Sequence, residues 1–138
     1  MGLRAQIEVK QKPYSVFLYT HWGADTILQD TIQGMIKGKS RWSDSTYLTR
    51  ILFDSLKKPA SAANGKVLDD AYSTTGYGIG TFQAGDIEKL VVVDTKHKEI
   101  KFYAVNSNVD QDRVLIDEWK FDEFVEDTSV IDILFSSN

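Results

Sequence analysis

Residues 14–19 have the sequence YSVFLY, a run of aromatic and β-branched side chains with the length of one strand. We expect this run to be a central strand, with the more polar IEVKQK of residues 7–12 as an edge-like or hairpin partner. Two helical patterns follow, with no strand pattern between them. Their apolar side chains recur at helical spacing, at Leu28, Ile32, Met35 and Ile36 in the first helix and at Leu48, Ile51, Leu52 and Leu56 in the second.

Polar residues and a glycine mark the expected ends of these helices. The first helix should begin after residues 25–26 and end near Gly38, because glycine suits the position after a helix. Ser43 or Asp44 can cap the second helix through its side-chain oxygen. Residues 59–75 are mostly small and polar, and they form a connection longer than most in a compact domain.

The second half of the chain is rich in strand patterns. Strands are expected at residues 76–82, 90–94, 99–105 and 114–120, with a hairpin turn at 95–98 and a short helix at 121–124. Because the helices do not alternate with strands, a doubly wound parallel sheet is disfavoured. We predict an α+β fold, a mostly antiparallel sheet with two consecutive helices packed on one face. Residues 1–127 would form this single domain, and residues 128–138, with the apolar patch VIDILF at 130–135, a tail or an edge strand.

The composition is that of an ordinary globular protein, with 138 residues, 42% hydrophobic and 26% charged. The chain has no cysteine, which excludes disulfides, thiolate metal sites and a cysteine nucleophile. No run has the length and apolarity of a signal peptide or a membrane helix. We therefore expect a cytoplasmic protein with no membrane partner.

The net charge of −4 hides an asymmetry between the two halves of the chain. Residues 1–66 carry a net charge of +5, and residues 67–138 carry −9. The overall acidity argues against a generic nucleic-acid partner. The basic half is compatible with a small anionic ligand. The acidic half faces either solvent or a basic partner surface, through Asp117, Glu118, Asp122, Glu123, Glu126 and Asp127.

Several familiar motifs fail on their spacing. The GKS of residues 38–40 is not a P-loop, because Gly34 is one residue too close and a helix precedes it. The GYGIG of residues 76–80 is followed by no helix whose N-terminus would hold a pyrophosphate. The NVDQD of residues 108–112 has oxygen spacing that suits calcium, but Arg113 stands where glycine is needed.

The sequence also contains no clear pattern of a metal or cofactor site. With only His21 and His97 and no cysteine, a zinc site would need carboxylates to complete it. His97 lies in a lysine-rich turn, where we expect it to be solvated. The G-x-S-x-G elbow of one large hydrolase class is absent from the sequence. We therefore expect no cofactor and no metal.

The leading candidate site lies where the YSVFLY strand meets the first helix, in the YTHWG of residues 19–23. Free backbone N–H groups and the helix dipole favour an anion at such a junction. His21 would be the acid–base group there, and Asp25 competes as a cap that fills the same place. The alternative is structural, with Trp22 packed in the core and His21 bonded to a backbone carbonyl.

Four more residues complete this candidate site. Arg41 and Trp42 precede the second helix and would supply a positive charge and a ring for stacking. Arg50 either reaches the ligand bidentately or pairs with Asp54 one turn further on. Tyr77 is flanked by glycines and would face the same pocket if its strand pairs beside the YSVFLY strand.

As a set, these motifs resemble a family of small prokaryotic and phage-encoded proteins to which no activity is assigned. The matching segments are YTHWG at 19–23, the pattern RWxDxxYLxRxxF at 41–53, GYGI at 76–79 and VVVD at 91–94. The resemblance covers about residues 16–125 and does not reach the tail. It implies no role for any residue, and a phage origin would imply a counter-defence setting.

Three functions of different classes follow from the sequence. The first is a small soluble binding protein that holds an anionic, nucleotide-like ligand at the strand–helix junction through His21, Trp22, Arg41, Trp42, Arg50 and Tyr77. The second is a protein-interaction inhibitor that uses the acidic C-terminal half and the patch at 130–135, a patch that also leaves self-association open. The third is a small enzyme in which Asp25 or Asp44 orients His21.

Overall fold

A computed structural model describes residues 4–11, 13–57, 75–106 and 112–127. The strands are β1 (Ala5–Gln11), β2 (Tyr14–Thr20), β3 (Tyr77–Gly80), β4 (Lys89–Asp94), β5 (Glu99–Asn106) and β6 (Asp112–Lys120). The helices are α1 (Ile27–Lys37), α2 (Ser45–Leu56) and α4 (Phe121–Val125), with single 3₁₀ turns η1 (Ala24–Thr26) and η2 (Lys39–Arg41). Most of residues 59–75, part of the NVDQD loop and the tail from residue 128 lie outside the described residues.

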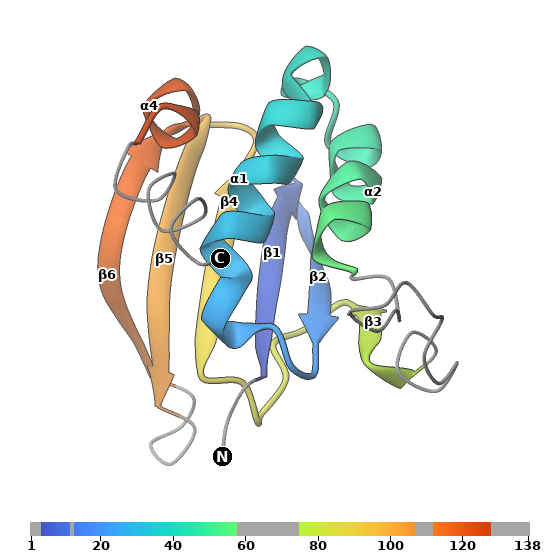
Figure 1. Ribbon diagram of the computed structural model, residues 1–138, viewed down its shortest axis with the longest axis vertical. Coiled ribbons are helices and arrows are strands. Elements are labelled where there is room, and N and C mark those ends of the chain that lie inside the picture. The colour runs from blue at the N-terminus through green and yellow to red at the C-terminus, as the bar shows by residue number, and fades with distance from the viewer. Residues whose placement is uncertain (1–3, 12, 58–74, 107–111, 128–138) are drawn as a thin grey trace, which may run out of the picture.

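The six strands form one sheet in the order β3-β2-β1-β4-β5-β6. The pair β1 and β4 is parallel, and the other four pairs are antiparallel. Helices α1 and α2 follow one another and cover the same face of the sheet (Figure 1). The predicted α+β fold is therefore confirmed. No helix in the described ranges has the length and apolarity needed to span a membrane.

The expected hairpin between the first two strands is confirmed, because β1 pairs antiparallel with β2, whereas the edge-like position expected for the first strand is wrong. β1 lies in the interior of the sheet between β2 and β4, so IEVKQK is not at an edge. Two of its polar side chains, Gln6 and Glu8, are buried and keep hydrogen-bond partners. Gln6 bonds the backbone of residues 82 and 84, and Glu8 bonds Ser15 and Arg113. Such partners let polar residues occupy an interior strand.

The helix-covered face carries the main core. Side chains of β1, β2, β4 and β5 pack there against α1, α2 and α4. The buried stripe of α1 is rotated from the expected one, since Ile36 is 52% exposed while Ile27 and Thr31 are buried. The rotation turns Gly34 toward α2, where an added Cβ would lie 3.2 Å from Cα of Leu52. Glycine at this position therefore sets how closely the two helices approach.

The opposite face of the sheet has two different halves. A second apolar cluster fills one half, and its buried members are Phe17, Ile87, Leu90, Val92 and Val105. The segment of residues 81–88, which joins β3 to β4, supplies part of this cluster and bonds Gln6. The other half, near the β1–β2 and β4–β5 turns, is polar. That polar half contains a candidate ligand pocket.

Candidate functional site

The strand–helix junction holds His21 in a cluster of charged and aromatic groups. The Arg4 guanidinium lies 3.3 Å from Nε2 of His21 and 3.2 Å from the Asp86 carboxylate. Trp22, which is 41% exposed, contacts the His21 ring edge-on at 4.7 Å between ring centroids. The arginine of this junction already faces a carboxylate, so little positive charge is left for an anion.

Tyr19 completes this cluster from the end of β2. Its hydroxyl donates to Asp86 at 3.2 Å. Burial raises the pKa of Tyr19, and the Asp86 charge and hydrogen bond raise it further. Tyr19 therefore remains a neutral donor at neutral pH. The N-termini of η1 and α1 have no side-chain cap. The expectation that Asp25 caps the helix and fills the junction is therefore wrong.

Tyr77 lies beside the junction, because its strand β3 pairs with β2, the strand of the YSVFLY run. β3 pairs antiparallel with β2, and the backbone N–H of His21 donates to the Gly76 carbonyl at 2.8 Å. Tyr77 stands opposite Thr20 in the register and packs against the helix-face core. The adjacency of the two strands is thus confirmed.

Arg41 and Trp42 lie at the other end of α1, in the connection to α2 (Figure 1). The 11 residues of α1 separate the two ends by about 16 Å. Trp42 donates its indole N–H to the Met35 carbonyl at 2.9 Å and packs edge-on against Phe121. Arg41 pairs with Asp44 at 3.6 Å. Both residues have structural partners.

Arg50 lies on the exposed side of α2 and pairs with Asp54 four residues later. Asp44 caps this helix, as expected, by accepting from the backbone N–H of Tyr47. The six predicted site residues therefore fall in three places: the junction, the α1–α2 connection and the outer side of α2. The structure does not bring them into one pocket.

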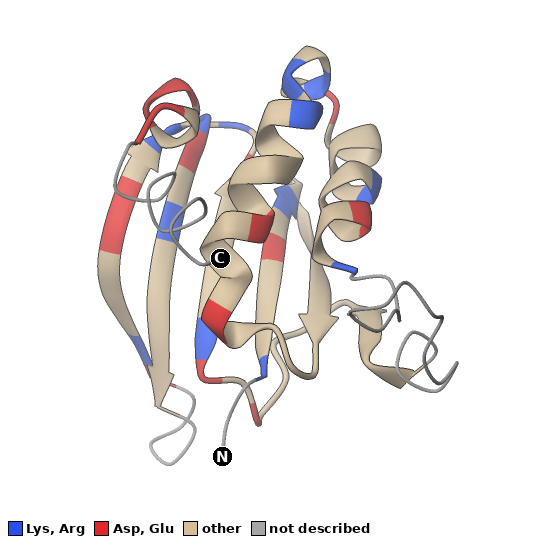
Figure 2. Ribbon diagram, viewed as in Figure 1, with Lys and Arg blue, Asp and Glu red and all other residues tan. Residues whose placement is uncertain are grey.

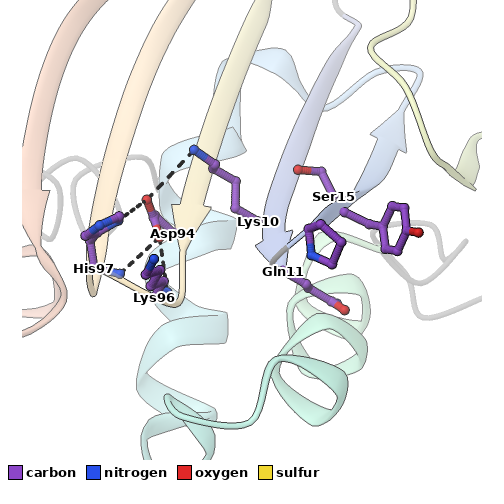
Figure 3. Close-up of a pocket in the computed structure, with 8 residues that line it drawn as sticks. Lys10, Gln11, Ser15, Asp94, Lys96 and His97 are labelled. Atoms are coloured by element: carbon purple, nitrogen blue, oxygen red, sulfur yellow. Dashed lines mark hydrogen bonds and ion pairs between the residues drawn. The ribbon is translucent and has the colours of Figure 1, made fainter.

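A pocket of about 250 Å³ lies instead at the end of the polar half of the sheet (Figure 3). We call it the hairpin pocket, because it lies between the β1–β2 and β4–β5 turns. Its lining residues are Lys10, Gln11, Pro13, Tyr14, Ser15, Asp94, Lys96 and His97. The Thr95 hydroxyl donates to the Lys10 carbonyl at 2.9 Å, which ties the two hairpins together.

Asp94 organises the charged side of the hairpin pocket. Its Oδ1 accepts from the backbone N–H groups of Lys96 and His97 at 3.1 and 3.0 Å, and its Oδ2 lies 3.0 Å from Nδ1 of His97. Lys10 Nζ lies 4.0 Å from the same carboxylate. Burial acts to raise the pKa of Asp94, but the hydrogen bonds from His97 and the charges of His97 and Lys10 outweigh it, so the net direction is downward. Asp94 is therefore ionised, and both of its carboxylate oxygens have partners within the protein.

One lining residue of the pocket, Ser15, is held in place by a buried carboxylate. Ser15 donates its hydroxyl to Glu8 at 2.6 Å, and Arg113 reaches the other Glu8 oxygen at 3.1 Å from β6. The Glu8 side chain is only 9% exposed. Because both oxygens have partners, this carboxylate positions Ser15 rather than facing a ligand.

Three residues near the pocket have the donor types of a metal site. Oxygen or nitrogen atoms of Asp94, His97 and Glu99 lie within 4.8 Å of one another. Both carboxylates are already opposite ammonium groups, Glu99 with Lys120 at 2.8 Å and Asp94 with Lys10 at 4.0 Å. A cation would have to compete with these ammonium groups for the two carboxylates.

The local sequence signal for this pocket is weak. Lys96 and His97 form a turn that looks solvated, and Lys10 lies in an ordinary strand. Their meeting depends on the parallel pairing of β1 with β4, which places the ends of these strands side by side. The chain matches no protein-family model, no curated protein and no solved structure. Its function must therefore be argued from this geometry.

Proposed function

We propose that this protein binds a small anionic, nucleotide-like ligand in the hairpin pocket. The observation that carries the proposal is the set of basic side chains, Lys10, Lys96 and His97, around a cavity of about 250 Å³. The one carboxylate among the lining residues, Asp94, is held by His97 and by backbone N–H groups. The lining thus has a net positive charge that an anion would neutralise.

An anion is attracted strongly only where several positive side chains face the same cavity. One pair of unit charges 4 Å apart gains about 1 kcal/mol in water and about 4 kcal/mol near a protein surface. A single exposed lysine therefore gives little affinity. Lys10 and Lys96 approach the same cavity from different hairpins, and a protonated His97 adds a third charge. Within the described residues, the Lys96 ammonium has no ion-pair partner, so it is the group most available to a phosphate.

The opposite side of the pocket suits a flat ring. Tyr14 is 77% exposed and stands beside Pro13 on the rim. Stacking of a base on an aromatic side chain contributes about 1–3 kcal/mol. The cavity, at about 250 Å³, is slightly smaller than the usual range for ligand pockets, roughly 300–1,000 Å³, which limits the ligand to a small one. A mononucleotide with its phosphate at Lys96 and its base over Tyr14 is the ligand class that fits.

The proposed ligand is of the anionic class inferred from the sequence, but its proposed site is the hairpin pocket instead of the strand–helix junction. The strand–helix junction offers an arginine already opposite Asp86, whereas the hairpin pocket offers Lys96 without an acidic partner in the described ranges. With the resemblance of residues 16–125 to phage-encoded proteins, the role we propose is sequestration of such a ligand in counter-defence.

Calorimetric titration with four probes tests the proposal: AMP, ADP, adenosine and inorganic phosphate. We expect AMP and ADP to bind, adenosine to bind at least about tenfold more weakly, and the double variant Lys10→Gln/Lys96→Gln to lose at least about tenfold in affinity. Lys57→Gln, an exposed lysine after α2, is the matched control and should bind like the wild type.

Two results would reject the proposed site. One is no heat and no thermal stabilisation with any phosphate-bearing probe at millimolar concentration. The other is binding that survives the double lysine substitution. Chromatography of the AMP and ADP after incubation separates binding from turnover, because recovered intact nucleotide supports a binding protein.

A further inference from the structure

The last strand of the sheet, β6, presents a surface that the hairpin pocket does not use. β6 stands at one end of the strand order, and no described strand lies on its outer side. Three consecutive apolar side chains on it are exposed, Val114 at 56%, Leu115 at 45% and Ile116 at 54%. An exposed strand edge with apolar side chains is a template for pairing with another extended chain.

The basic side chains of β6 have acidic partners within the protein, whereas its acidic side chains form no ion pair in the described ranges. Its two basic residues reach back to the protein's own carboxylates, Arg113 to Glu8 at 3.1 Å and Lys120 to Glu99 at 2.8 Å. Asp112, Asp117 and Glu118 are exposed, and in the described ranges none of them has a lysine or arginine within ion-pair distance. The outward strip of β6 is consequently apolar and acidic.

The acidic strip continues onto α4. Figure 2 shows red over α4 and over the adjoining half of β6, while blue gathers at the α1–α2 connection. Asp122 and Glu126 are exposed on or beside α4. A partner that follows β6 toward its C-terminal end therefore meets negative charge along its course.

We propose that the outer edge of β6 binds an extended segment of a partner protein in which lysine or arginine alternates with apolar residues. The segment adds to the sheet as a further strand beside β6. Side chains along a strand alternate between the two faces of a sheet. The basic side chains of the segment therefore lie on the face of Asp117 or on that of Glu118, and its apolar side chains lie on the other face, beside members of Val114–Ile116. This inference goes beyond ligand binding in the hairpin pocket and does not depend on it.

The same features argue against a second copy of this chain as the occupant. Two β6 edges paired antiparallel around Asp117 and Glu118 would place the acidic residues of one copy against those of the other, which destabilises cross-strand pairs. The register also shifts in β6, where Ile116 has no partner between Asp117 opposite Phe102 and Leu115 opposite Tyr103. A bulge on an edge strand discourages indiscriminate pairing and favours a short segment.

The test measures fluorescence anisotropy of a labelled nine-residue peptide, KVKVKVKVK, with the full-length protein. We expect saturable binding, no binding of the matched EVEVEVEVE peptide, and at least about tenfold weaker binding when alternate backbone amides of KVKVKVKVK are N-methylated. The charge-reversal variant Asp117→Lys/Glu118→Lys should also bind at least about tenfold more weakly. Asp25→Lys/Asp54→Lys changes the net charge equally on another surface and should stay within about twofold of the wild type.

The N-methylated peptide tests strand pairing without altering the protein. Equal binding of both peptide forms would overturn the proposal in favour of plain charge attraction. Absence of saturable binding by KVKVKVKVK would overturn it as well, because the edge would then be closed to an added strand. Sedimentation of the free protein as a dimer that Asp117→Lys/Glu118→Lys dissociates would assign the edge to a second copy instead.

Discussion

Replacement of Arg113 by methionine should destabilise the fold far more than an ordinary surface substitution. Arg113 is 36% exposed, but its partner Glu8 is 9% exposed and lies in the middle of the sheet. Removing one member of a buried ion pair costs about 3–5 kcal/mol, because a charge is left buried without its partner. Ser15 keeps its hydrogen bond to Glu8 and Arg113 is partly solvated, so we expect about 2 kcal/mol.

Urea unfolding followed by circular dichroism measures this change. With a slope of about 1–3 kcal/mol/M, a loss of 2 kcal/mol moves the midpoint by roughly 1 M. Arg50→Met is the matched control, since its pair with Asp54 is more than half exposed on both sides and should be worth less than about 0.5 kcal/mol. Glu8→Gln combined with Arg113→Met should recover part of the loss, because no buried charge then remains.

Equal shifts of the midpoint in Arg113→Met and Arg50→Met would contradict a buried charge at Glu8 as the origin of the cost. A double variant less stable than Arg113→Met alone would contradict it as well, since Glu8 would then not be the source of the cost. Near-ultraviolet circular dichroism before unfolding checks that each variant keeps its tertiary packing.

Two further substitutions test the turn of the hairpin pocket and the helix contact. The hydrogen bonds of the turn hold the pKa of Asp94 below its ordinary value of 3.8, so its contribution is fully present above that value and is lost as the pH falls through the lower folded-state pKa. The difference in unfolding free energy between the wild type and Asp94→Asn should therefore shrink below about pH 4, and a gap that widens there would reverse the sign of the argument. Gly34→Ala should destabilise by about 1 kcal/mol although alanine favours helices, because its Cβ would lie 2.7 Å from Cδ2 and 3.2 Å from Cα of Leu52. A higher thermal midpoint would show that α1 and α2 separate without cost.

The architecture could be predicted from the sequence because its local signals agree. Helical spacing, the Asp44 cap and the turn at residues 95–98 each specify one element. The interior position of β1 was not predictable in this way. Gln6 is satisfied by a backbone group 78 residues away and Glu8 by an arginine 105 residues away. A polar residue in a strand looks edge-like until such partners are known.

The candidate site was harder to predict for the same reason. Arg41 and Arg50 have the residue types that bind anions, but each has an acidic neighbour within one helical turn that takes its charge. Local spacing favours these internal pairs over a ligand. The hairpin pocket joins residues more than 80 positions apart, tied by the hydrogen bond between Thr95 and the Lys10 carbonyl. Only the parallel pairing of β1 with β4 brings them together.

The charge asymmetry of the sequence acquires a different meaning in three dimensions. Division at residue 66 suggests a basic half that holds the ligand and an acidic half that holds the sheet. The sheet mixes the two, because β1 and β2 of the basic half lie between β3 and β4 of the acidic half. Lys10 comes from one half and Lys96 from the other, and they meet at one pocket. The excess acid is left on β6 and α4, the last described elements, where no described strand covers the outer edge of the sheet. One fold thereby separates a basic pocket from an acidic edge, so Lys10 and Lys96 of the pocket can be substituted without altering Asp117 and Glu118 of the edge.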